Sequence, residues 1–78
     1  MSDRLPRLTA KEVIRILERR GFNLSRSSGS HYIYKSVEGK RVTVPVHAGK
    51  TIHLKVLRNI LRDMEMTVDE LKEEMRHR

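Results

Sequence analysis

The chain has 78 residues, with 17 lysines and arginines against 10 aspartates and glutamates, and no cysteine. This length excludes large enzyme folds such as an α/β barrel or a doubly wound sheet, and the lack of cysteine excludes disulfides, thiolate nucleophiles and cysteine-ligated zinc. No apolar run approaches the roughly 18 residues of a membrane span, and the first residues have no apolar stretch typical of a signal peptide. We therefore expect one cytoplasmic domain over residues 1–78, without membrane association.

The charge is distributed unevenly along the chain. Residues 1–62 contain 14 basic and 4 acidic side chains, whereas residues 63–78 contain 3 basic and 6 acidic ones. The net charge of +7 therefore comes from the part that also carries most of the folding patterns. A strongly basic surface favours a polyanionic partner, above all nucleic acid. A basic surface that serves only solubility is the alternative.

A capping box predicts the start of the first helix. The Thr9 hydroxyl can accept from an amide of the first turn, while the Glu12 carboxylate reaches back to the backbone of Thr9. Gly21 predicts the end of the helix. The apolar stripe of this helix consists of Ala10, Val13, Ile14 and Leu17. A basic row on the outer side, either a phosphate-binding edge or a solvated face, consists of Lys11, Arg15 and Arg19.

Three short strands are predicted next, over residues 22–26, 31–36 and 41–46. They are separated by turns at residues 27–30 and 38–39. Turns this short join antiparallel neighbours, so the sheet should be antiparallel. Pro45 cannot donate a hydrogen bond to a sheet, which places it at a sheet edge or at a strand end.

Two helices complete the pattern. The first is predicted from an apolar stripe formed by Leu54, Leu57, Leu61 and Met64, which Ile60 widens. A short acidic helix over residues 67–77 begins with a second capping box, formed by Thr67 and Glu70. The order α-β-β-β-α-α predicts an α+β fold, in which a three-stranded antiparallel sheet has helices on one face and is open on the other.

Strand alternation divides the central strand into two faces. Tyr32 and Tyr34 share one face. The other face carries His31, Ile33 and Lys35. We expect the tyrosines to face the helices, because two aromatic rings gain more from burial than an imidazole and an ammonium group. Ile33 is then an exposed apolar side chain, and the same open face should carry Thr43, Pro45 and His47. The opposite assignment, with His31 inward, is the alternative.

The sequence offers little support for a metal or nucleotide site. Gly49-Lys50-Thr51 matches only the tail of a phosphate-binding loop, and the histidines lack the spacing and the nearby carboxylates of a metal site. His31 is different, because it follows a turn that leaves amides and a hydroxyl available. An imidazole exchanges protons near neutral pH, and RNA supplies its own nucleophile, the 2′-hydroxyl. His31 is therefore chemically sufficient for RNA cleavage without a metal or cofactor; a structural histidine is the alternative.

Several motifs occur in a characteristic order and spacing. They are Gly21-Phe22, Gly29-Ser30-His31-Tyr32-Ile33-Tyr34, Val42-Thr43-Val44-Pro45-Val46-His47 with Gly49-Lys50, and Leu57-Arg58-Asn59-Ile60-Leu61. Together they resemble the HicA (YcfA-like) mRNA interferase toxins over about residues 8–72. The resemblance implies a fold similar to double-stranded-RNA-binding domains, cleavage of mRNA, a catalytic His31, and neutralisation by a HicB antitoxin.

The remaining candidate residues are expected to bind RNA. Phosphate contacts are expected from Arg26, Lys35 and Lys50. His47 either contacts phosphate or transfers the second proton, with a loop histidine bonded to the backbone as the alternative. Gly29 and Ser30 either orient His31 and hold a phosphate or form an ordinary turn. Two other functions stay open: a non-catalytic RNA-binding module, and a protein-interaction domain whose basic face meets an acidic antitoxin.

Overall fold

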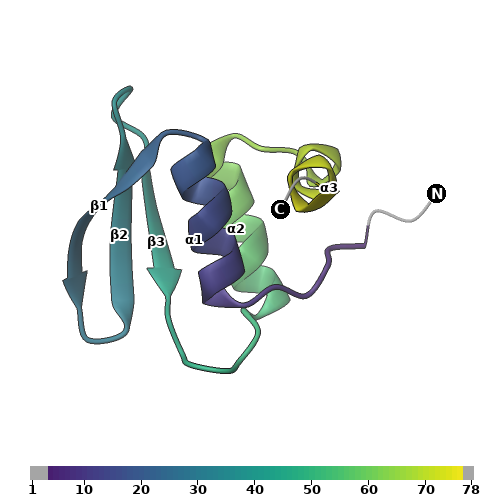
Figure 1. Ribbon diagram of the computed structural model, residues 1–78, viewed down its shortest axis with the longest axis horizontal. Coiled ribbons are helices and arrows are strands. Elements are labelled where there is room, and N and C mark those ends of the chain that lie inside the picture. Colours follow the sequence, from purple (N-terminus) through teal and green to yellow (C-terminus); the bar gives the residue numbers. More distant parts are fainter. Residues whose placement is uncertain (1–3, 77–78) are drawn as a thin grey trace.

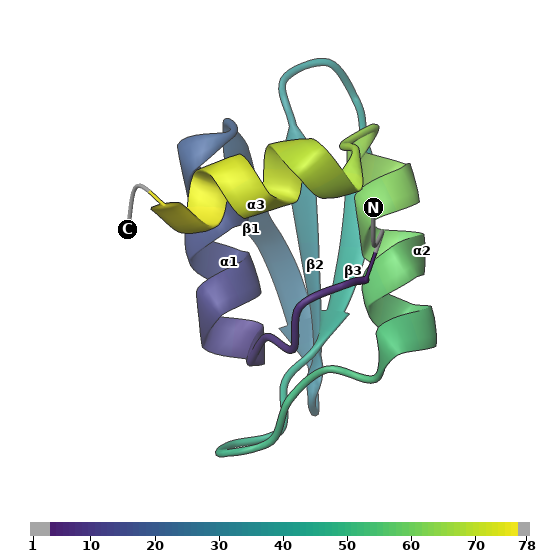
Figure 2. The ribbon, with the colours of Figure 1, turned by 90° about the vertical axis from the view of Figure 1, so that its right-hand side faces the viewer.

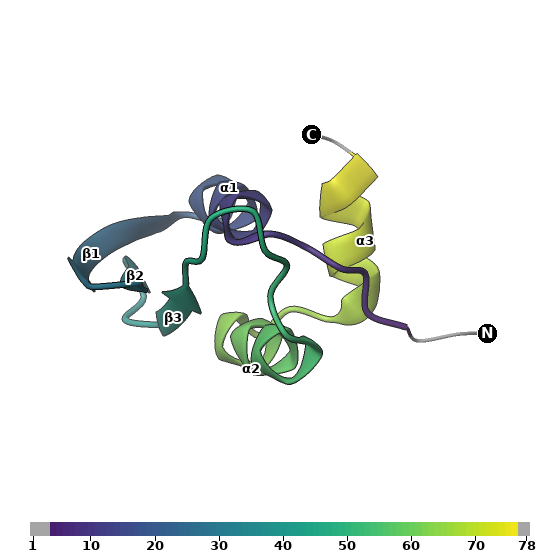
Figure 3. The ribbon, with the colours of Figure 1, turned by 90° about the horizontal axis from the view of Figure 1, so that it is seen from below.

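The computed structural model describes residues 4–76 and arranges them as a sheet, a pair of helices on it and one outer helix (Figure 1). The elements are α1 (Ala10–Arg19), β1 (Phe22–Ser28), β2 (His31–Ser36), β3 (Arg41–Pro45), α2 (Leu54–Met64) and α3 (Val68–Arg76). The antiparallel strands lie in the order β1-β2-β3, with α1 and α2 on one face and the other face open (Figure 3). The predicted α+β fold is confirmed. Within residues 4–76, no helix is long and apolar enough to cross a membrane.

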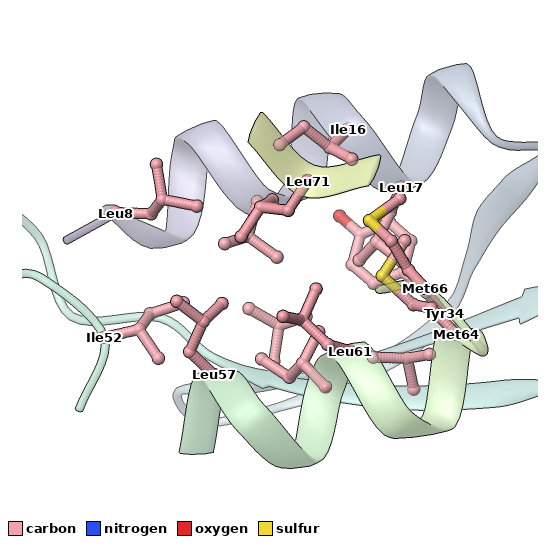
Figure 4. Close-up of a cluster of buried hydrophobic side chains, with 14 of the residues drawn as sticks. Leu8, Ile16, Leu17, Tyr34, Ile52, Leu57, Leu61, Met64, Met66 and Leu71 are labelled. Carbon is pink, nitrogen blue, oxygen red and sulfur yellow. The ribbon is translucent and has the colours of Figure 1, made fainter. Parts of the chain in front are cut away.

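The predicted capping box begins α1. The Thr9 amide donates to Glu12 Oε1 at 2.9 Å, and the Glu12 amide donates to Thr9 Oγ1 at 3.3 Å. The predicted apolar stripe needs one correction, because Ile16 is 6% exposed whereas Ile14 is only half-buried. α1 lies between the sheet and α3, so it buries a second side that a single stripe does not describe. Figure 4 shows Ile16 near Leu71 of α3.

The hairpin between β1 and β2 is tighter than predicted. β1 continues to Ser28, which pairs with His31, so only Gly29 and Ser30 form the turn. The predicted turn over residues 27–30 is therefore too long. Serine-rich composition suits a turn and an exposed edge strand alike, and a two-residue turn is the commonest way to close a hairpin.

A β-bulge at Ser25 changes which side chains of β1 face outward. Leu24 pairs with Tyr34 on the helix side, but Arg26 pairs with Ile33 on the open side. In a regular strand, residues 24 and 26 would share a face, so the extra residue turns Arg26 onto the open face. Strand alternation alone would have placed this arginine on the wrong side.

α2 follows its predicted apolar stripe except at the first position. The buried residues are Leu57, Ile60, Leu61 and Met64, whereas Leu54 is 39% exposed. Ile52 of the preceding loop fills the core at this end, and its amide donates to the Leu8 carbonyl oxygen at 2.7 Å. The prediction for Leu54 is wrong because the loop before the helix already supplies the apolar side chain needed there.

α3 crosses the outer side of α1 and α2 (Figure 2). Its predicted capping box is present, since the Glu70 amide donates to Thr67 Oγ1 at 3.1 Å. Leu71 is 1% exposed and joins the core between the two inner helices (Figure 4). The helix is described from Val68 to Arg76, and the predicted last residue, 77, lies outside the described residues. α3 is thus a third layer of the fold.

A charged contact also holds α3. The Glu74 carboxylate accepts from Arg19 at 2.6 Å and from Arg20 at 2.7 Å at the end of α1. Burial raises the pKa of Glu74, but the hydrogen bonds and charges of these arginines outweigh it and keep the pKa below its ordinary value. A folded-state pKa below the unfolded one stabilises the fold above the ordinary glutamate pKa, and this contribution disappears as the pH falls through the folded value. Arg19 therefore has a structural role in docking α3.

Candidate functional site

His31 lies on the open face of the sheet, where β2 begins directly after the turn. Its cross-strand neighbours are Ser28 of β1 and Pro45 of β3, and its side chain is exposed. On the opposite face, Tyr34 is 4% exposed and the half-buried Tyr32 packs against the core. The predicted outward placement of His31 is confirmed, and the inward alternative is wrong.

The turn before His31 is tied to the segment that follows β3. The Val46 amide donates to the Ser30 carbonyl oxygen at 2.6 Å. Gly29 has a φ of +58°, so any other residue there would be strained even though an added Cβ would meet no atom within 4 Å. The conformation of the turn therefore accounts for Gly29, and a phosphate contact by Gly29 or Ser30 stays a prediction.

Three cations surround Ile33 on the open face. A shallow hollow, which we call the sheet depression, is lined by Ser25, Arg26, Ile33, Lys35 and Arg41. Arg26 is the cross-strand neighbour of Ile33, and Lys35 is that of Arg41. Ile33 is half-buried there, so the expectation of an exposed apolar side chain is wrong. The aliphatic stems of long basic side chains commonly cover apolar surface in this way.

Arg41 of the sheet depression is not among the candidate residues predicted from the sequence. Arg41 alternates with Val42, which is fully buried against the helices, so it faces outward with Thr43. The alternation that assigned Lys35 to the open face would have found it. Arg26 was predicted, but its placement depends on a bulge for which the sequence carries no clear signal.

A second hollow lies just beyond β3. This loop depression is lined by Pro45, His47, Lys50, Thr51, Ile52, His53 and Val56. The structure therefore brings His47 and Lys50 together, and both lie near Pro45, the cross-strand neighbour of His31. β3 ends at Pro45, one residue earlier than predicted, and His47 lies in the loop that follows the strand.

The cations of the two depressions are available to an anionic partner. No acidic residue lines either hollow. Within residues 4–76, ion pairs are absent for the four basic side chains Arg26, Lys35, Arg41 and Lys50. In the same part of the chain, no group of three His, Asp or Glu side chains is placed to bind a metal ion. The open face, which carries the exposed imidazole of His31, and the adjoining loop thus both present unpaired positive charge.

A comparison of the sequence with models of known protein families finds a match that covers this surface. The family model described as HicA toxin of bacterial toxin-antitoxin matches residues 10–66. The matched region runs from the start of α1 to just beyond α2, so it contains His31 and both depressions and leaves α3 outside. A comparison with curated proteins finds no match.

Proposed function

This chain belongs to the HicA toxin family of bacterial toxin–antitoxin systems, and on that premise we propose that it is an endoribonuclease that cleaves mRNA without a metal ion. The placement of His31 carries the proposal. Its imidazole is exposed at the start of the central strand, on the face that no helix covers. The loop depression begins at Pro45, the cross-strand neighbour of His31, and the sheet depression lies further along the same open face, from Ile33 onward. An RNA strand can therefore reach His31 without any change in the fold.

Cleavage at this site requires two proton transfers. His31 takes the proton of a 2′-hydroxyl, whose oxygen attacks the adjacent phosphorus. The bond from phosphorus to the 5′ oxygen breaks, and a second group donates a proton to that leaving oxygen. The products are a 2′,3′-cyclic phosphate and a 5′-hydroxyl. His47 is the candidate for the second donor, because its loop begins beside the cross-strand neighbour of His31.

The basic side chains supply the electrostatic part of the mechanism. The proposed phosphate-binding residues are Arg26, Lys35, Arg41 and Lys50. Fixed cations of this kind hold the substrate through its phosphates, and one that reaches the attacked phosphate also stabilises the negative charge that grows there. Gly29 and Ser30 form the turn that positions His31. The protein partner we propose is a HicB-type antitoxin, which neutralises the toxin by covering this face.

The purified protein is expected to cleave an mRNA transcript in a buffer with excess EDTA. Because the substrate is held through its phosphates, the rate at sub-saturating RNA should fall steeply as the salt concentration rises. The measurement is gel analysis of an end-labelled transcript over a salt series. Binding without cleavage at every salt concentration would contradict the proposal and favour the non-catalytic RNA-binding module.

A pair of arginine variants provides the matched comparison for this assay. Arg41→Ala removes a cation from the sheet depression and should slow cleavage at low salt. Arg76→Ala removes the same charge from the exposed end of α3, away from the open face. This variant should cleave RNA at the normal rate at low salt. Equal slowing by both would show that only the net charge matters.

A further inference from the structure

The loop depression continues into two further hollows along one edge of the molecule. The second hollow is lined by Arg7, Thr51, Ile52, His53 and Leu54, and the third by Arg4, Leu5, Arg7, Leu54 and Arg58. Each hollow shares two or more lining residues with the next. Together they form one path, which we call the edge groove, from Pro45 beside His31 to Arg58 on α2.

The lining residues of the edge groove follow a bend of the backbone from β3 through the loop to α2. The groove starts at the edge of the sheet, follows the loop between β3 and α2, and ends where the N-terminal segment passes α2 (Figures 2 and 3). A nucleic-acid duplex is stiff over lengths far greater than this domain, whose longest extent is 37 Å. A single strand is flexible enough to follow this bend.

The lining of the edge groove is cationic and partly apolar. Within residues 4–76, Lys50, Arg7 and Arg58 form no ion pair, and no acidic side chain lines any of the three hollows. Leu54, which is 39% exposed, lines the same two hollows as Arg7 and shares the last of them with Arg58. Spaced cations with an accessible apolar surface suit a strand that presents phosphates on one side and base faces on the other.

We propose that the edge groove binds the single-stranded RNA that flanks the cleaved bond, from the neighbourhood of His31 to Arg58. The inference rests on the proposed function, since it assigns the path of the same substrate. It adds a second set of phosphate contacts, centred on Arg7 and Arg58. Arg7 lies outside the residues 10–66 that the family model matches, whereas Arg58 lies within them.

Contacts this far from the cleaved bond strengthen binding without changing the chemical step. The flanking strand is held equally in the ground state and in the transition state, so its loss raises KM and leaves kcat unchanged. The effect must also depend on substrate length. A short RNA that occupies only the surface around His31 does not reach Arg7 or Arg58.

The test compares RNAs of about 4 and about 12 nucleotides with the double variant Arg7→Ala/Arg58→Ala. Both arginines are exposed, so the fold should be retained, which circular dichroism checks. The double variant should bind the longer RNA about tenfold more weakly, with a salt slope flatter by about 1.4, and should bind the shorter RNA normally. The matched control is Arg62→Ala/Arg76→Ala, which removes two exposed cations that line none of these hollows. Binding is measured in a His31→Ala background to prevent cleavage, and kcat and KM in the otherwise unchanged protein.

The outcomes separate this inference from the proposed function. Normal binding of the longer RNA by the double variant, or equal losses for both lengths, would overturn the edge groove as an RNA path. Protection of residues 4–8 and 54–58 by an antitoxin, with RNA binding unaffected by the substitutions, would assign the groove to a protein instead. Length-dependent binding by a protein that cleaves no RNA would support the groove and refute the nuclease.

Discussion

Replacing His31 with alanine is expected to lower the rate of RNA cleavage by roughly 10²–10⁴-fold, the usual contribution of a positioned acid or base. The side chain is exposed on the open face and belongs to no part of the core, so thermal stability should change little. Cleavage of a labelled transcript and thermal unfolding of the same samples measure the two effects. RNA affinity should stay within a few-fold of the unchanged protein, because the phosphate-binding cations remain.

Ser28→Ala is the matched control for His31→Ala. Ser28 is the cross-strand neighbour of His31 and is also exposed, but its hydroxyl cannot exchange protons near neutral pH. The Ser28→Ala variant should cleave RNA at close to the rate of the unchanged protein. Full activity of His31→Ala would contradict the catalytic assignment, and loss of the folded spectrum would show that His31 is structural.

The second large effect concerns α3, which lies outside the region shared with the family. Leu71→Ala should lower the free energy of unfolding by about 2–5 kcal/mol, because it removes a fully buried side chain and leaves a cavity. Leu71 is 1% exposed and lies among core side chains of α1 and α2 (Figure 4). A domain of 78 residues has a free energy of unfolding of roughly 4–12 kcal/mol in total, so this loss is a large part of its stability.

Urea denaturation measures this loss, with Asp69→Ala on the exposed side of α3 as the control. The control should shift stability by about 0.5 kcal/mol or less. At low temperature, where Leu71→Ala is still folded, its cleavage rate should be normal, because α3 and the open face lie on opposite sides of the molecule. Unchanged stability of Leu71→Ala would show that α3 does not dock on the helices.

Rules of local periodicity account for the parts of the fold that the sequence predicted. Both capping boxes depend on side chains three residues apart, and alternation along β2 placed Tyr34 inside and His31 outside. The predictions of burial were wrong where a segment distant in the sequence determines whether a side chain is buried. Ile16 is buried because α3 adds a layer, and Leu54 is exposed because Ile52 already fills the core.

The candidate site also contains residues that local patterns predict and residues that only tertiary structure places. His31 and Lys35 follow from the alternation of one strand, and Arg41 could have been found by applying the same rule to the next strand. Arg26 reaches the open face only through the bulge at Ser25, which is set by pairing with a neighbouring strand. The edge groove joins residues from the N-terminal segment, a loop and α2, so no local pattern predicts it.

The central claim is that His31 activates the 2′-hydroxyl of the RNA itself, and one substrate tests it most directly. After the cleaved bond of an oligonucleotide has been mapped in EDTA, a second oligonucleotide carries a single 2′-deoxynucleotide on the 5′ side of that bond. We expect cleavage at this bond to stop while cleavage at other bonds continues, and the unmodified RNA to yield a 2′,3′-cyclic phosphate. Cleavage of the modified bond at the normal rate would contradict the account, because the nucleophile would then have to be water or a protein side chain.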